Sequence, residues 1–250
     1  MVISLCAAGH LSATENNPNN DNKFMEENLN LTQEWDKTFP QSDKVDHKKI
    51  TFHNRYGITL AADLYVPKNV TGKLPAIAIS GPFGAVKEQA SGLYAQTLAE
   101  RGFLTIAFDP SYTGESSGQP RYVASPDINT EDFSAAVDYL STRDDVDAER
   151  IGILGICGWG GMALNAAAID TRIKATVTAT MYDMSRVNAN GYFDSMNADA
   201  RHELRRQLNA QRTEDYRNGT FALGGGVVDP LPADAPQFVK DYHAYYKKPR

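Results

Sequence analysis

The sequence predicts an α/β fold: a mostly parallel sheet with helices on both faces. Short apolar runs alternate along the chain with helical patterns, which is typical of such a sheet. The three most unusual loops, SGPFGAVKEQ, FDPSYTGESSGQPR and GICGWGG, each follow a predicted strand. Because chemistry in open parallel sheets lies beyond the carboxyl ends of the strands, we expect the three loops to meet there.

The pattern assigns each element in turn. A short helix is expected around Asn28–Trp35, ending before Pro40, and KKITFHNRYGITLAADLYVP predicts a β-hairpin that turns at Gly57. Further strands are expected at 75–81, 103–110, 150–157 and 172–181, and further helices at 88–102, 129–143 and from 158 to about 169.

The chain divides by composition into three parts: a leader or polar segment (1–24), an α/β core (25–186) and a helical cap (187–250). Polar helical stretches are expected at 197–219 and 236–248, and no strand pattern follows residue 181. The 172–181 strand would therefore form an open edge of the sheet, which cap helices, a second copy of the chain or another segment must cover.

Composition excludes several function classes. The 250 residues carry a net charge of −6, so there is no basic excess to attract nucleic acid. No apolar run approaches the roughly 20 residues that span a bilayer. The sequence has no HExxH, no clustered metal ligands and no P-loop, and the glycines at 224–226 follow no strand, so neither a metal nor another cofactor is expected.

The N-terminus leaves two interpretations open. MVISLCAAGHLSA resembles the second half of a secretory signal peptide, but the basic start is missing. A clipped signal peptide would place the protein in the periplasm or outside the cell, whereas a polar leader would belong to a cytoplasmic protein. If this leader is removed, Cys157 is the remaining cysteine of the two and cannot form an internal disulfide.

GICGWGG, residues 155–161, is similar to a nucleophile elbow, in which G-x-nucleophile-x-G holds a reactive side chain on a strained strand-to-helix turn. Cys157 would be the nucleophile, and the positive end of the following helix favours its thiolate. The backbone N–H of Gly158 would donate to an oxyanion, with Phe83 as the second donor because Pro82 has no N–H, and Gly84 next. The alternative is that Cys157 is a small buried apolar residue.

The chain also resembles the dienelactone hydrolase-like branch of the α/β-hydrolase superfamily, from about His47 to Arg250. The resemblance rests on GPFGAVKEQ, FDPSYTGES, SPDINTEDFSAAVDYL, ERIGILGICGWGGMALNAAA and TMYDMSR, in this order. It implies an α/β-hydrolase-type fold, a cysteine or serine nucleophile, an oxyanion hole and ester, lactone or thioester-like substrates. By this resemblance Cys157 is the nucleophile, and Phe83 and Gly158 are the oxyanion donors.

Trp159 stands where the elbow usually has its last glycine, so it either crowds the turn or forms a wall of the acyl pocket. Together with Gly84 and Tyr182, it is a candidate substrate-binding residue. Asp183, directly after the 172–181 strand, is either the catalytic acid or an ordinary turn residue. For Glu88 and Glu115, in the loops at the same edge, helix capping and solvation are the simplest roles.

No histidine fits the superfamily order of nucleophile, acid and histidine. His10 is in the leader, His47 and His53 are in the first hairpin, and His202 and His243 are in the cap. His243 is either a substitute base or a surface histidine on an aromatic helix. We therefore expect the acid and histidine after residue 250, with the last two strands of the fold, and weak catalysis by these 250 residues alone.

Three functions remain open. The first is a hydrolase that forms an acyl-cysteine intermediate on a small ester-type substrate. The second is an acyltransferase or thioesterase that uses the same intermediate. The third is a binding protein that keeps the fold without catalysis. A homo-oligomer or a complementing C-terminal segment is the expected partner.

Overall fold

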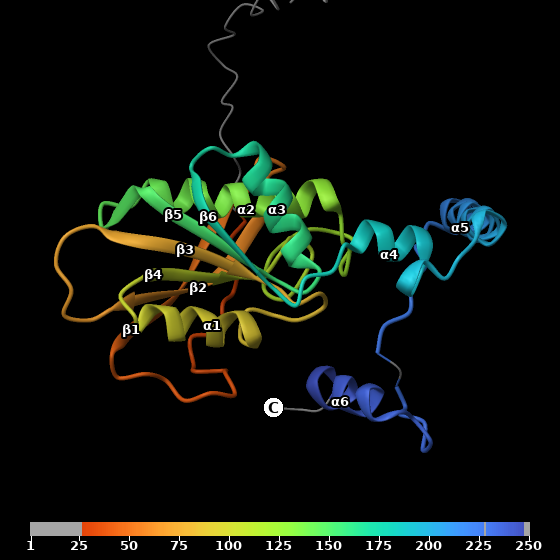
Figure 1. Ribbon diagram of the computed structural model, residues 1–250, viewed down its shortest axis with the longest axis horizontal. Helices are drawn as coiled ribbons and strands as arrows, with labels where there is room; N and C mark the ends of the chain where they lie inside the picture. The colour runs from red at the N-terminus through yellow and green to blue at the C-terminus, as the bar shows by residue number, and fades with distance from the viewer. Residues whose placement is uncertain (1–26, 228, 248–250) are drawn as a thin grey trace, which may run out of the picture.

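The protein is built on one mixed sheet of six strands, in the order β1-β2-β4-β3-β5-β6. The computed structural model describes residues 27–227 and 229–247. Helix α1 covers one face of the sheet, and α2 and α3 lie side by side on the other (Figure 1). The elements follow in the order β1 (Val45–His53), β2 (Thr59–Pro67), β3 (Leu74–Ser80), α1 (Ala90–Ala99), β4 (Leu104–Phe108), α2 (Pro126–Ser141), β5 (Val146–Ile156), α3 (Trp159–Ile169), β6 (Ile173–Ala179), α4 (Met184–Asn190), η1 (Tyr192–Asp194), α5 (Ala198–Asn218) and α6 (Gln237–Tyr246).

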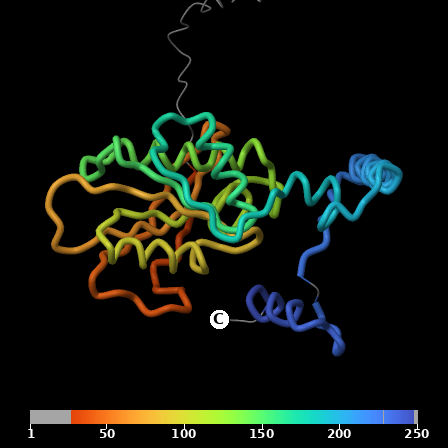
Figure 2. Tube along the Cα trace, viewed as in Figure 1, coloured from red at the N-terminus to blue at the C-terminus, as the bar shows by residue number. Residues whose placement is uncertain are grey.

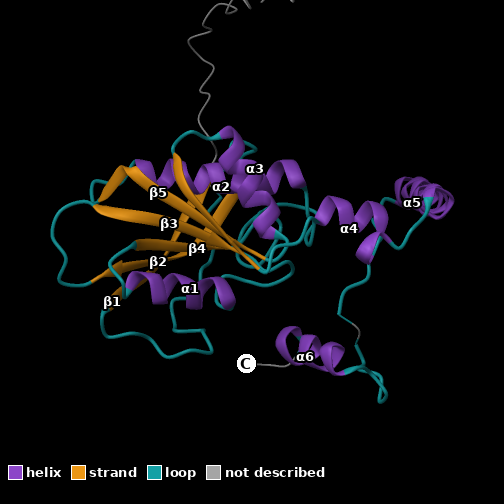
Figure 3. Cartoon of the chain, viewed as in Figure 1, coloured by secondary structure: helices purple, strands orange, loops and turns teal. Residues whose placement is uncertain are grey.

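The predicted fold class is confirmed, with the hairpin and the four later strands in their expected places. Strands β3, β4, β5 and β6 pair in parallel, whereas β1 pairs with β2, and β2 with β4, in antiparallel fashion. Gly57 takes the positive φ of +75° that the hairpin turn requires. The parallel strands bring the loops that follow β3, β4 and β5 to one edge, as expected (Figure 3).

Apolar periodicity explains the helix positions. Phe133, Val137 and Leu140 of α2 form one buried face, as their spacing predicts, and they pack with β-strand residues such as Leu64 and Ile106. Ser125 caps the start of α2 through its side-chain oxygen, and Pro126 occupies the first helical position, where no N–H is needed.

The helix expected around Asn28–Trp35 is wrong, because this segment is not helical. Distant side chains fix it instead. The Lys37 ammonium is fully buried 3.1 Å from an Asp63 carboxylate oxygen in β2, and the Thr32 N–H donates to a Glu115 carboxylate oxygen at 2.8 Å. These long-range contacts override local helix propensity.

The C-terminal part lies beyond the carboxyl end of the sheet, where α4, α5 and α6 follow one another (Figure 2). The two predicted cap helices are confirmed as α5 and α6; α4 and η1 are additional. Within the described ranges no strand follows β6, which forms one edge of the sheet with Val177 exposed. No helix of the described residues is long and apolar enough to cross a membrane. The predicted leader, with Cys6 and His10, lies outside the described residues.

Candidate active site

Cys157 sits on a strained turn between β5 and α3. Its φ of +57° is in the left-handed region, which is uncommon for a residue with a side chain. The turn is held on both sides. The Cys157 N–H donates to the carbonyl of Ala179 at 2.9 Å, and its carbonyl accepts from the N–H groups of Gly160 and Tyr182. The thiol is half-buried and forms no disulfide.

Two glycines allow the elbow to form. A Cβ on Gly155 would lie 2.3 Å from the carbonyl oxygen of Trp159, and a Cβ on Gly81 would lie 2.4 Å from that of Ile156. Both distances are shorter than any real Cβ contact, so no other residue fits either position without backbone movement. The turn after β3 and the elbow after β5 are thus in direct backbone contact.

This contact places Phe83 beside the elbow. A Cβ built on Gly158 would be 3.4 Å from the Cβ of Phe83, which shows that the two residues are neighbours. Among the described residues, the N–H groups of Phe83 and Gly158 donate no hydrogen bond within the protein. Two unpaired backbone donors next to a thiol are the arrangement that stabilises an oxyanion in acyl transfer.

Trp159 occupies the first position of α3, and its side chain is almost fully buried. Its ring lies 5.5 Å from that of Phe83, centroid to centroid. Both line a cavity of about 460 Å³ together with Gly84 and Arg121. Trp159 therefore forms a wall of a cavity and leaves the turn intact. Tyr182 faces a second cavity, on the side of α6.

The structure gives Asp183 a local role. Its carboxylate accepts the N–H of Arg186 at 2.9 Å and so caps α4. The histidines are dispersed. His47 is bonded to Asp63 at 2.7 Å, His53 is in β1 at the opposite edge of the sheet, His202 is exposed on α5, and His243 lies 3.5 Å from an Asp229 oxygen.

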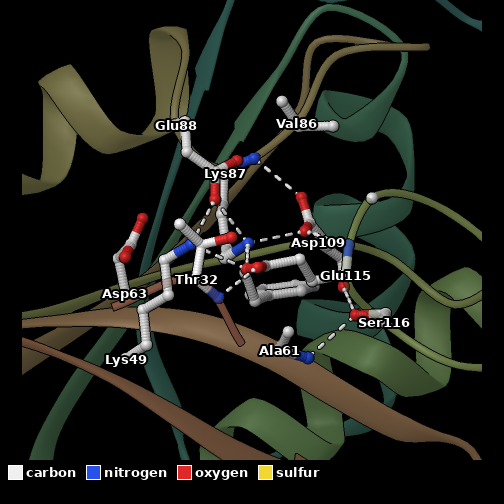
Figure 4. A network of polar contacts seen from close by, with 12 residues as sticks. Thr32, Lys49, Ala61, Asp63, Val86, Lys87, Glu88, Asp109, Glu115 and Ser116 are labelled. Atoms are coloured by element: carbon white, nitrogen blue, oxygen red, sulfur yellow. Dashed lines mark hydrogen bonds and ion pairs between the residues drawn. The ribbon is translucent and has the colours of Figure 1, made fainter. Parts of the chain in front are cut away.

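A largely buried ion cluster surrounds Lys87, in the loop between β3 and α1 (Figure 4). The ammonium of Lys87 pairs with three carboxylates: Glu88 at 2.5 Å, Asp109 at 2.9 Å and Glu115 at 2.6 Å. Sequence reasoning expected no cluster of metal-type ligands, yet these carboxylate oxygens lie within 4.8 Å of one another. Lys87 is the cation that they share. The capping and solvation roles expected for Glu88 and Glu115 are therefore wrong.

The cluster ties three chain segments together. The backbone N–H of Lys87 donates to one Asp109 oxygen at 2.7 Å, and the N–H of Glu115 donates to the other at 2.9 Å. Lys49 of β1 adds a second ammonium, 2.8 Å from Glu115 and 3.1 Å from Glu88. The loops after β3 and β4 are thus fixed to each other and to β1.

The surroundings shift the acidity of these groups. Burial raises the pKa of Asp109, against the opposing effect of the Lys87 ammonium. Partial burial also disfavours ionised Glu115, but hydrogen bonds from Lys49 and Lys87 prevail and lower the pKa of Glu115 to about 2. Glu115 is therefore ionised at neutral pH and contributes a negative charge to the cluster.

The sequence did contain a signal for the cluster: charged residues lie in two loops that were predicted to meet at one edge of the sheet.

Comparison with known proteins identifies the family. Residues 56–223, more than half of the chain, match the family described as X-Pro dipeptidyl-peptidase (S15 family). The chain belongs to this α/β-hydrolase family. The predicted membership of the α/β-hydrolase superfamily is thereby confirmed. The α/β hydrolase GrgF from Penicillium has the same fold, with a TM-score of 0.62 at 22% identity over 74% of this chain and 60% of its own.

The Pseudomonas aeruginosa protein PA2218 is 60% identical over the whole of this chain, which spans 66% of that protein's length. Its crystal structure matches with a TM-score of 0.85 at 64% identity, over 89% of this chain and 70% of that one. The thiohydrolase aneE of Aspergillus aculeatus and the acyltransferase drtE of Aspergillus calidoustus are each 29% identical over 55% of this chain, and over 42% and 44% of their own lengths.

Gly155→Ala tests the close backbone contact at the elbow. The added methyl would meet the Trp159 carbonyl at 2.3 Å, so we expect a loss of about 1–3 kcal/mol in the free energy of unfolding. Gly225→Ala is the control, because nothing lies within 4 Å of a Cβ there. Urea unfolding measures both variants, and equal stability of the two would contradict the described contact.

Lys87→Met tests the ion cluster. The change leaves the buried Asp109 without its cation and leaves Glu88 and Glu115 with Lys49 alone, so we expect unfolding to become easier by about 3–5 kcal/mol. Lys73→Met, at an exposed position, should leave the urea midpoint nearly unchanged. A loss below about 1 kcal/mol in Lys87→Met would show that the carboxylates find other partners.

Glu115 predicts a specific acid dependence. Its folded-state pKa of about 2 is below its ordinary 4.5, so its stabilisation is complete above pH 4.5 and is lost as pH falls toward 2. The stability difference between wild type and Glu115→Gln should therefore shrink across this window. Urea midpoints from pH 2 to 6 measure it, with exposed Glu149→Gln as the control. A difference that stays constant with pH would refute the prediction.

Proposed function

We propose that the protein cleaves ester, lactone or thioester bonds through a covalent acyl intermediate on Cys157. The observation that carries this proposal is the elbow: a thiol on a left-handed turn, flanked by the unpaired N–H groups of Gly158 and Phe83. Relatives named thiohydrolase and acyltransferase support the choice of acyl chemistry.

The reaction follows from the geometry in two steps. The Cys157 thiolate attacks the acyl carbon, and the carbonyl oxygen becomes an oxyanion that accepts hydrogen bonds from Phe83 and Gly158. The bond to the leaving group breaks, and the leaving group takes up the proton that the thiol released. Water then attacks the acyl-cysteine, and a carboxylic acid and the free thiol are formed.

In this proposal Gly84 and Trp159 contact the substrate through the cavity that they line with Phe83. Tyr182 contacts it from the opposite side. Asp183 remains a candidate acid, although its carboxylate caps α4. The expected weak turnover of these 250 residues stays a prediction.

An acyltransferase that resolves the same intermediate with another nucleophile is the second candidate, favoured by the likeness to drtE. A hydrolase releases the acid in water alone, whereas an acyltransferase holds the adduct until an alcohol, amine or thiol is added. The fate of the acyl-cysteine therefore separates the two functions. A non-catalytic binding protein would form no adduct at all.

Cys157→Ala tests the nucleophile. After incubation with a p-nitrophenyl ester or an N-acetylcysteamine thioester, intact-mass spectrometry should detect one acyl group on wild type and none on the variant. Iodoacetamide should label Cys157 and block adduct formation. Ser185→Ala, which removes an exposed hydroxyl, is the matched control and should acylate like wild type. Absence of any wild-type adduct together with absence of p-nitrophenol release would favour the binding protein.

A further inference from the structure

We propose that the cavity between Tyr182 and α6 is the acyl pocket, and that it takes an uncharged aromatic or bulky apolar acyl group. The cavity measures about 500 Å³, within the size range of ligand pockets. Four aromatic side chains and two valines line it: Tyr182, Tyr192, Val227, Phe238, Val239 and Tyr242. This inference rests on the proposed function and names its substrate class.

The cavity adjoins the nucleophile. Tyr182 is bonded to the elbow itself, because its N–H donates to the Cys157 carbonyl at 3.2 Å. The Tyr192 ring lies against that of Tyr182, with centroids 6.1 Å apart and planes nearly perpendicular. Burial raises the pKa of Tyr192, which favours the neutral phenol beside Tyr182. An acyl group on Cys157 would therefore have these rings as its nearest walls.

Helix α6 closes the opposite side. Its residues Phe238 and Tyr242 are four apart and share one face of the helix. The same helix is fastened to the loop after β3, where Tyr246 donates to the Phe83 carbonyl at 3.1 Å and Tyr245 accepts the Ala90 N–H at 3.2 Å. Phe238 and Tyr242 are 64% and 48% exposed, so both rings have apolar surface available for contact with a ligand.

The side chains that line the cavity favour an uncharged acyl group. None of the side chains around this cavity is charged, so a carboxylate on the acyl group would lose its water without gaining a cation. Arg121, which lines the cavity beside Trp159, already donates to the carbonyls of Ser116, Gly114 and Gly118. The aromatic rings that line the cavity favour contact with another ring or a branched apolar chain.

Two thioesters that differ in the acyl group test the pocket: benzoyl- and succinyl-N-acetylcysteamine. Binding to Cys157→Ala, measured by calorimetry, separates affinity from turnover. We expect the benzoyl compound to bind about tenfold more tightly or better. Phe238→Ala and Tyr242→Ala, each combined with Cys157→Ala, should weaken benzoyl binding about fivefold or more and leave succinyl binding unchanged.

Tyr216→Ala is the matched control, because Tyr216 is an exposed aromatic residue on α5 outside the cavity. Equal affinity for the two compounds would refute the proposed pocket. A loss of benzoyl affinity in Tyr216→Ala as large as that in Phe238→Ala or Tyr242→Ala would refute it as well. If Cys157→Ala does not fold, initial acylation rates of wild type with the two thioesters give the same comparison. A preference for the benzoyl compound without any wild-type adduct would support the pocket and refute the covalent mechanism. An adduct without such a preference would support the covalent mechanism and refute the pocket.

Discussion

The site depends on one steric constraint: the backbones of two turns touch. Gly81, after β3, has no Cβ, and a methyl there would overlap the Ile156 carbonyl of the elbow; Gly155 has none either, and a methyl there would overlap the Trp159 carbonyl within the elbow itself. The contact between the two turns brings Phe83 against Gly158, so that the two backbone N–H groups proposed as oxyanion donors lie in neighbouring residues. A larger residue at Gly81 would push the turn after β3 away from the elbow, and with it Phe83 away from Gly158.

Below this contact, the ion cluster fixes the far end of the same loop. Lys87 follows Phe83 by four residues, and Asp109 receives the backbone N–H groups of both Lys87 and Glu115. Buried ion pairs add little net stability compared with apolar packing, because desolvation offsets much of the Coulomb attraction. Their directional bonds instead hold two loops at one mutual position. The cluster therefore sets where Phe83 lies relative to Cys157.

The sequence predicted those features whose signals are local. Alternating apolar runs located β3 to β6, and glycine spacing around Cys157 located the elbow. The failures involve partners far apart in sequence. Lys37 is held by Asp63, and Glu115 is bonded to Lys49, 66 residues away, so neither could be assigned from its neighbours. The position of α6 likewise depends on Tyr246 and Phe83, which are 163 residues apart.

In the proposed mechanism, that last contact couples specificity to catalysis. Helix α6 lines the aromatic cavity with Phe238 and Tyr242. Tyr246, about one turn after Tyr242 in the same helix, bonds to the loop that carries Phe83. A ligand that packs against α6 would therefore contact a helix that is also bonded to the loop of Phe83, the proposed oxyanion donor. An acyl group of the wrong shape would disturb both the pocket and the donor, because a single helix serves the two. In this way the rate of acylation would respond to the shape of the acyl group as well as to its affinity.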